Sequence, residues 1–260
     1  MWKTPLFLAA FLVLGACERP NHDIGSDNAG ESDAMAHEQS SESIKSRRAI
    51  WPPLTDNADT LNAQASNAIN YYIVLDGSGS MLSRECAGNS TKMQAALDAV
   101  LDFIGTVPKQ ANIGLAAFDK RVIAERVPLG SDNRDALVDA LSKIRAGSDT
   151  PLRSTIQIAY NKLTEQGRKQ LGYGEYHLIV VTDGQPDPDD EDPTPIVNKI
   201  LAASPVVIHT IGFCIDEHHV LNQKGRVYYA SANNPQQLQK SLSAVLAEAD
   251  TFDATAFAAP

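Results

Sequence analysis

The sequence predicts an α/β protein built on a doubly wound, mostly parallel sheet of about six strands, with one antiparallel edge strand and helices on both faces. Short, nearly continuous apolar segments recur along the chain, and such segments are typical of strands that are buried on both faces. Segments with apolar residues at helical spacing lie between most of them. Two further apolar segments follow each other so closely that they indicate a hairpin, which supplies the antiparallel strand.

The elements of this sheet are expected in a regular order along the chain. The first strand, 71–75, leads into a helix over 93–104, where apolar residues recur at helical spacing. Segments 111–118 and 122–127 form the expected hairpin around Asp119-Lys120. The remaining elements are helices over 136–144 and 156–163, a strand that ends at Asp183, a helix over 195–203, strands over 206–213 and 227–229, and a closing helix over 238–246.

The composition fits one substantial hydrophobic core. Of the 260 residues, 43% are hydrophobic and 21% are charged, but the first quarter of the chain contributes little apolar material to that core. The formal net charge is −10, and no basic stripe is present that would displace counterions from phosphates. Nucleic acid is therefore not an expected partner.

The amino terminus has the pattern of a secretion signal. Lys3 precedes an apolar run over 6–14 that is too short to span a bilayer. Leu14-Gly15-Ala16-Cys17 then resembles the lipobox of bacterial lipoproteins, which implies cleavage before Cys17 and attachment of acyl chains to it. Glu18 replaces the aspartate that retains such proteins at the inner membrane, so we expect an outer-membrane anchor facing the periplasm. The alternative is a secreted protein in which Cys17 is incidental.

The segment that follows Cys17 has few large apolar side chains. It is rich in Ser, Asn, Asp, Glu and Ala, and it is expected to stay disordered as a tether with a reach on the order of 35 to 40 Å. We therefore divide the chain into a signal peptide (1–16), the lipidated cysteine with its tether (17–66), a folded domain (67–250) and a short tail (251–260).

Hydroxyl and carboxylate side chains follow the first predicted strand. Asp76, Ser78 and Ser80 alternate with glycines that allow the backbone to turn tightly. Thr150 opens a helical pattern, and Asp183 follows another apolar strand. In a doubly wound sheet, ligands bind at the carboxyl ends of the strands, where Asp76 and Asp183 both fall. Oxygen ligands favour Mg²⁺, with Mn²⁺ or Ca²⁺ as alternatives, and disfavour zinc.

Other interpretations of the first motif fail on spacing. A phosphate-binding loop needs a lysine after the second glycine, but Ser80 follows Gly79. An aspartic-protease motif needs Asp directly before Ser-Gly or Thr-Gly, and Gly77 intervenes. An ordinary Gly/Ser turn would be the better interpretation of this motif by itself. The two additional segments, in the right order and context, favour the metal site.

These three segments resemble the von Willebrand factor A domain family and its metal-ion-dependent adhesion site, over roughly 67–250. The resemblance implies that Ser78, Ser80 and Thr150 donate hydroxyl oxygens, while Asp76 and Asp183 act mostly through hydrogen bonds and bound water. Neutral ligands leave the cation short of negative charge, so it attracts one more anionic ligand. In this family, a Glu or Asp of a protein partner typically supplies that ligand. We therefore expect a binding module, not an enzyme, and no small-molecule substrate.

Two other functions stay open at this point. An envelope assembly or scaffold protein with a structural metal fits the sequence almost as well. A metal-dependent hydrolase fits less well, because no Ser-His-Asp or Cys-His pair can be assigned at useful spacing. Asp149 departs from the small residues common in the family, and it is expected to face solvent.

The remaining chemistry-bearing residues give weaker signals. Cys86 and Cys214 both follow predicted strands, so they form either a disulfide, as an oxidising periplasm permits, or two buried free thiols. His218 and His219 are expected in a solvated loop, and His209 is expected to pack within its strand. The acidic run 187–192 lacks the glycine of an EF-hand and is expected to be a solvated loop near the metal face.

Overall fold

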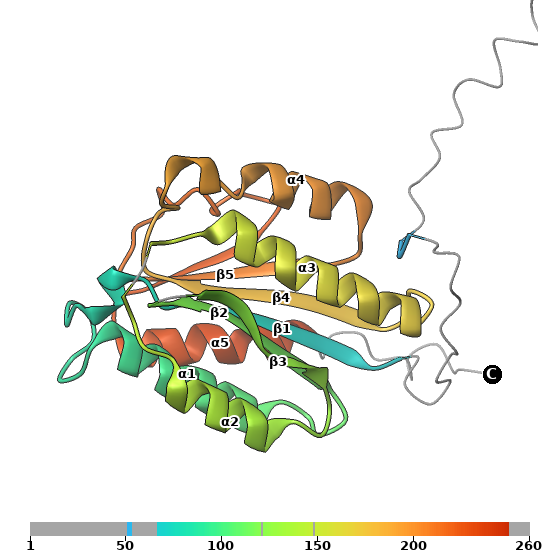
Figure 1. Cartoon of the computed structure of the whole chain (residues 1–260), viewed down its shortest axis with the longest axis horizontal. Coiled ribbons are helices and arrows are strands. Elements are labelled where there is room, and N and C mark those ends of the chain that lie inside the picture. Colours follow the sequence, from blue (N-terminus) through green and yellow to red (C-terminus); the bar gives the residue numbers. More distant parts are fainter. Residues whose placement is uncertain (1–50, 54–66, 121, 148, 250–260) are drawn as a thin grey trace, which may run out of the picture. The chain divides into compact units, whose positions relative to one another are not determined.

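A six-stranded sheet forms the centre of the part of the chain that the computed structural model describes, namely residues 51–53, 67–120, 122–147 and 149–249. The strand order is β3-β2-β1-β4-β5-β6 (Figure 1). Cys17, the signal peptide, most of the predicted tether and the tail 251–260 lie outside the described residues.

The strands are parallel except at one edge, which confirms the predicted topology. β1 pairs in parallel with β2 and β4, β5 lies between β4 and β6 with both pairings parallel, and β3 is antiparallel to β2. The chain order therefore reverses around β1, and ligands of such sheets bind at this kind of switch point. The strands are β1 (Ile69–Asp76), β2 (Asn112–Asp119), β3 (Val122–Gly130), β4 (Glu175–Thr182), β5 (Val207–Phe213) and β6 (Tyr228–Ala232).

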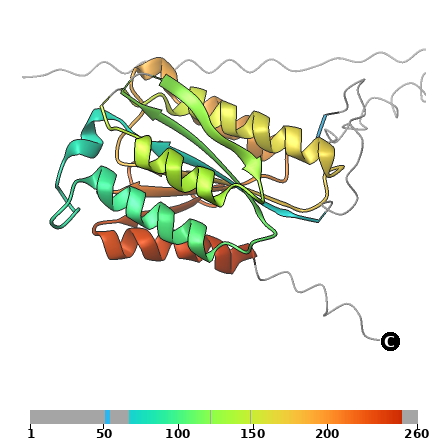
Figure 2. The same cartoon turned by 60° about the horizontal axis from the view of Figure 1, so that its bottom comes forward.

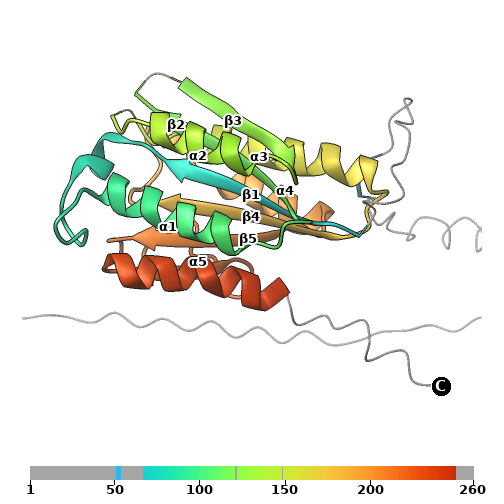
Figure 3. The same ribbon diagram turned by 90° about the horizontal axis from the view of Figure 1, so that it is seen from below.

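Helices cover both faces of the sheet, as expected. One face carries α1 (Lys92–Thr106), α2 (Arg134–Lys143) and α5 (Pro235–Ala249), and Figures 2 and 3 show α1 between the other two. The opposite face carries α3 (Leu152–Lys169) and α4 (Thr194–Ala203) (Figure 1). None of the helices in the described ranges is long and apolar enough to cross a membrane.

Two short helical turns were not expected from the sequence. They are the 3₁₀ helices η2 (Gly79–Leu82) and η3 (Asp189–Glu191), each within a loop at the carboxyl ends of the strands. Such turns are too short to produce a hydrophobic period, so pattern analysis does not detect them.

The two cores follow from the alternation of side chains along β1. Tyr71, Ile73 and Leu75 pack in the core beneath α1, α2 and α5, whereas Tyr72 and Val74 pack in the core beneath α3 and α4. All five side chains are buried. A central strand covered on both faces must be apolar at every position, and this explains the continuous apolar run that marks β1 in the sequence.

A short segment from the predicted tether packs against the folded domain. The rings of Trp51 and Tyr176 meet edge to face with their centroids 4.6 Å apart. A β-carbon at Gly167 would collide with the Trp51 indole, so the glycine makes room for it. The Arg168 Nε donates a hydrogen bond of 3.2 Å to the Pro53 carbonyl. This contact lies at the end of α3 and the start of β4, at the edge of the sheet opposite the carboxyl ends of its parallel strands.

Candidate metal site

The structure brings all five predicted metal ligands to the edge of the sheet that is formed by the carboxyl ends of its parallel strands. Asp76 ends β1, and Asp183 directly follows β4, its parallel neighbour. Ser78 and Ser80 lie in the loop after β1, and Thr150 lies two residues before α3. The parallel pairing of β1 with β4 therefore places Asp76 beside the loop that carries Asp183.

Asp76 is fully buried and holds the first loop in shape. Its Oδ1 accepts a hydrogen bond of 2.7 Å from the Ser78 backbone N–H. Its Oδ2 accepts one of 2.6 Å from the Thr182 hydroxyl. Burial raises the pKa of Asp76 to about 6, against the opposing effect of these hydrogen bonds. The carboxylate thus joins the ends of β1 and β4.

The hydroxyl oxygens converge on a small region beside Asp183. Ser78 Oγ lies 2.9 Å from Ser80 Oγ, and the Ser80 hydroxyl donates a hydrogen bond of 2.6 Å to Asp183 Oδ1. A β-carbon at Gly184 would lie 3.6 Å from Thr150 Oγ1 and 3.8 Å from Ser80 Oγ. Oxygens from three separate loops therefore lie close to one another.

Backbone hydrogen bonds tie these loops together. The Gly147 N–H donates a hydrogen bond of 2.8 Å to the Gly77 carbonyl. A β-carbon at Gly77 would collide with the Phe118 carbonyl, so only glycine fits beside β2. Thr150 and Asp187 exchange two backbone hydrogen bonds of 3.0 and 3.1 Å. The side chains are held on loops that support one another.

The donor set fits a hard divalent cation. Two carboxylates and three hydroxyls are the ligand types that Mg²⁺, Mn²⁺ and Ca²⁺ accept. Among the described residues, no group of three or more His, Cys, Asp and Glu side chains could hold a metal ion. The site depends on serine and threonine oxygens instead, and such a set is unsuited to zinc.

Lys92 is a site residue that the sequence analysis missed. It is the first residue of α1, its exposed fraction is only 5%, and its Nζ lies 2.9 Å from Asp183 Oδ2. The preceding Thr91 caps the helix by accepting a hydrogen bond from the Gln94 N–H. A cation in the first turn opposes the helix dipole. In the sequence, the available signal was a lysine directly after a capping threonine, a position where a positive charge is unfavourable for the helix.

His219 was expected in a solvated loop, and for this residue the expectation is wrong. Its exposed fraction is 3%, and its Nδ1 accepts a hydrogen bond of 3.1 Å from the Leu221 N–H. Its Nε2 therefore donates to the Gly184 carbonyl, 2.7 Å away. Burial lowers the pKa of His219, which favours this neutral ring. The imidazole supports the loop that follows Asp183, while His218 is exposed as expected.

A disulfide joins Cys86 and Cys214, with sulfur atoms 2.04 Å apart. It connects the loop after the first motif with the end of β5.

In the acidic loop, both Glu191 carboxylate oxygens accept hydrogen bonds from Ser154, in the first turn of α3. This part of the loop has a structural role, whereas Asp149 is exposed as expected.

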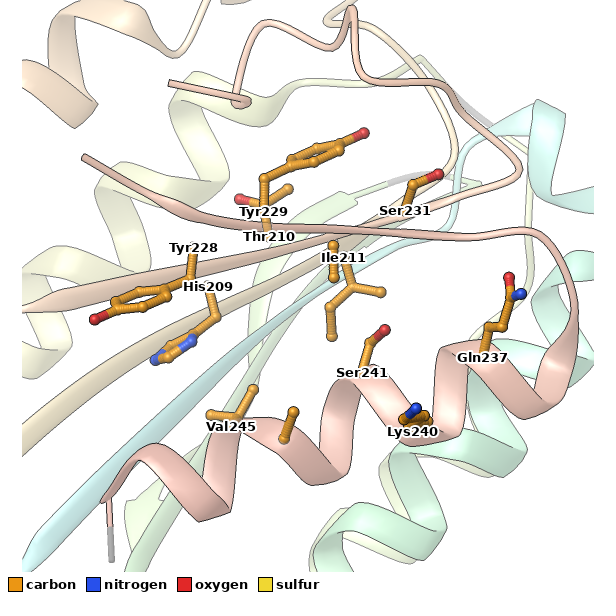
Figure 4. Close-up of a pocket in the computed structure, with 12 residues that line it drawn as sticks. His209, Thr210, Ile211, Tyr228, Tyr229, Ser231, Gln237, Lys240, Ser241 and Val245 are labelled. Carbon is orange, nitrogen blue, oxygen red and sulfur yellow. The ribbon is translucent and has the colours of Figure 1, made fainter. Parts of the chain in front are cut away.

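A cavity of about 390 Å³ lies away from these residues, between β6 and α5 (Figure 4). His209 and Tyr228 face Ser241 and Val245 of α5 across it. None of the five predicted ligands lines this cavity. His209 itself is buried, in agreement with its predicted place in a strand, and its ring stacks on Tyr228.

Comparisons with known proteins agree with this fold. The family model of the von Willebrand factor type A domain matches residues 70–251. The collagen alpha-2(VI) chain of Gallus gallus is 28% identical over 153 residues, which cover 54% of this chain but only 14% of the collagen chain.

Two solved structures illustrate the shared fold. The SpRpn10 VWA domain has a TM-score of 0.54 at 15% identity, covering 67% of this chain and 93% of that domain. The manganese-loaded TRAP protein of Plasmodium vivax has a TM-score of 0.50 at 15% identity, covering 68% of this chain and 72% of that one. At such identities the likeness is one of fold.

Proposed function

Since the chain belongs to the von Willebrand factor type A domain family, we propose that it captures a protein partner through a divalent cation. Members of this family are adhesion and protein-interaction modules, and some of them depend on a metal. Asp76, Ser78, Ser80, Thr150 and Asp183 would hold that cation. We propose Mg²⁺, with Mn²⁺ or Ca²⁺ as alternatives, and the manganese in the TRAP relative supports a divalent ion of this kind.

The convergence of three hydroxyls beside a carboxylate carries this proposal. Ser78, Ser80 and Thr150 offer neutral oxygens, which coordinate a cation without cancelling its charge. Asp76 is buried and already accepts two hydrogen bonds, so it organises the loop. A cation held in this way retains an unmet demand for negative charge, which a partner's Asp or Glu satisfies.

We propose binding and not catalysis. General base chemistry requires a side chain with a free lone pair near the cation. The Lys92 ammonium is paired with Asp183, and both ring nitrogens of His219 are engaged with backbone groups. Lys92 and His219 therefore support the shape of the site.

We further propose that the domain is held at the outer membrane, facing the periplasm, by acyl chains on Cys17. The Cys86–Cys214 disulfide supports an oxidising compartment. Trp51 packs at the edge of the sheet opposite Asp76 and Asp183. A tether that joins the domain there leaves the metal edge accessible to a partner.

Replacement of Thr150 tests this function. Thr150→Ala removes one proposed hydroxyl ligand, whereas Thr150→Ser keeps it. Measured in chelator, the free energy of unfolding of Thr150→Ala should fall by about 1 kcal/mol or less. Capture of the partner by cross-linking from a membrane extract should fall to the level seen with chelator in Thr150→Ala and should persist in Thr150→Ser.

Thr106→Ala is the matched control, because Thr106 ends α1 at the opposite edge of the sheet and its hydroxyl bonds only to the Phe103 carbonyl among the described partners. It should capture the partner normally. Full retention of a metal-dependent partner by Thr150→Ala would contradict the ligand set. A partner that withstands both the substitution and the chelator would instead identify a permanent scaffold with a structural metal.

A further inference from the structure

The ion pair between Lys92 and Asp183 places a fixed positive charge inside the candidate metal site. We propose that Lys92 is a positioning residue that weakens metal binding by the free protein and thereby makes tight binding depend on a partner's carboxylate. This inference rests on the proposed function of the same site.

The geometry makes Lys92 part of the site. Asp183 accepts a hydrogen bond of 2.6 Å from Ser80, a proposed ligand, on Oδ1, and one of 2.9 Å from Lys92 on Oδ2. The same carboxylate therefore contacts both a metal-binding hydroxyl and an ammonium group. Any cation held by Ser80 lies within a few ångströms of Asp183, so it experiences the Lys92 charge at short range.

Lys92 is also held in place by its backbone. Its N–H donates a hydrogen bond of 2.8 Å to the Ser83 carbonyl, in the loop that continues from Ser80. The side chain is almost completely buried, so the ammonium does not have the freedom of a surface lysine. Its position is fixed relative to the first metal-binding loop.

Stability alone does not account for a lysine at this position. A cation in the first turn of α1 opposes the helix dipole. Taking an ammonium and a carboxylate out of water costs free energy that their attraction often only offsets. A neutral hydrogen-bond donor would satisfy Asp183 without opposing the dipole and without the desolvation of an ammonium, and this points to a role for the charge itself.

The charge balance shows what that role does. The carboxylates of Asp76 and Asp183 and the Lys92 ammonium together carry a formal charge of −1, so a bound divalent cation leaves the site at +1. Without Lys92 the carboxylates alone carry −2, and the same cation would be neutralised. Lys92 therefore repels the metal in the free protein and strengthens the attraction for an anionic partner once the metal is bound.

Calorimetric titration of the full chain in detergent with Mn²⁺ tests this inference. Lys92→Met should bind Mn²⁺ at least about ten-fold more tightly than the wild type, because a like charge has been removed. Lys92→Arg should bind as the wild type does. The matched control is Lys143→Met, which removes an exposed lysine paired with Asp139 on α2 and should change nothing.

Sodium acetate serves as a probe for the partner's carboxylate. It should strengthen Mn²⁺ binding to the wild type more than to Lys92→Met, since the neutralised site no longer attracts an anion. In chelator, Lys92→Met should unfold at a lower denaturant concentration, because Asp183 is left buried without its cation. Lys92→Gln is titrated with Mn²⁺ in the same way, because its amide can still donate a hydrogen bond to Asp183 but carries no charge. We expect its affinity for Mn²⁺ to rise as much as that of Lys92→Met.

The opposite result overturns the inference. If Lys92 only holds Asp183 in position, both Lys92→Met and Lys92→Gln will bind Mn²⁺ more weakly than the wild type or equally well. If the wild type binds Mn²⁺ and these two variants bind it more weakly or equally well, the proposed function stays intact and only the role of Lys92 is removed. Absence of Mn²⁺ binding in the wild type and in all the Lys92 variants overturns the proposed function together with this inference.

Discussion

Removal of the Cys86–Cys214 disulfide should lower the stability of the domain strongly. The bond joins residues that are 128 positions apart, so it constrains most of the folded chain. It also holds the loop after the first proposed metal-binding segment against the end of β5. The replacement Cys86→Ser/Cys214→Ser removes this restraint and leaves two small polar side chains.

The size of the effect follows from the loop that the bond closes. A loop of this length loses about 16 to 17 cal/mol/K of entropy in the unfolded state, equivalent to about 5 kcal/mol at 25 °C. Measured losses are commonly smaller, and removal of a native disulfide typically costs 2 to 5 kcal/mol. A loss at the upper end of this range is expected, because the closed loop is long.

Urea unfolding of the wild type and the double variant in chelator measures this loss, without any contribution from bound metal. Cys17→Ser is included in both proteins, because it prevents lipid attachment at this residue and also prevents exchange of an unmodified third thiol with the disulfide. Reduction of the wild type with dithiothreitol should reproduce the value of the double variant. A difference below about 1 kcal/mol would refute the assigned role of the bond in stability.

Three further predictions concern regions outside the candidate metal site. Trp51→Ala should lower the free energy of unfolding by about 2 kcal/mol, and Gly167→Ala should give a similar loss, because its β-carbon would collide with the Trp51 indole; equal urea midpoints in all three proteins would contradict the packing. Burial and the neighbouring His177 lower the pKa of His209 to about 3, so the stability that its neutral ring provides is present above pH 6.5 and is lost as the pH falls toward 3. Between pH 7 and pH 5 we expect His209 to contribute a loss of about 2 kcal/mol, so His209→Gln should lose about 2 kcal/mol less than the wild type over this range, and an equal loss in both proteins would contradict this role. Cys17→Ser should abolish incorporation of a labelled fatty acid in cells, and label on that variant would exclude the lipid anchor.

The fold could be predicted almost completely from the sequence, because its strands are buried on both faces. Continuous apolar segments and helical periods are direct consequences of that burial, and they identified every strand and every α-helix in the described residues. The antiparallel edge followed from the short connection between β2 and β3. The 3₁₀ turns η2 and η3 escaped detection, because three or four residues do not establish a period.

The candidate site could be predicted only in part. Asp76 and Asp183 follow their strands directly, so the topology of the sheet alone brings them to the same edge. Lys92 and His219 reach that edge from a helix start and a distant loop, and their contacts depend on tertiary packing. Composition cannot distinguish a buried lysine or histidine from an exposed one. The packing of Trp51 could not be predicted for the same reason, because the space for its indole is created by Gly167, far along the chain.

Metal binding at the site that Asp76 organises is the central claim, and a calorimetric titration of the full chain with Mg²⁺ and Mn²⁺ tests it most directly. The wild type should show one divalent-cation site, and Asp76→Ala should lose it, because the buried carboxylate holds both the first loop and the end of β4. Asp149→Ala, which removes an exposed carboxylate one residue from Thr150, should retain the site. Saturable binding of equal strength in the wild type and Asp76→Ala would contradict the account.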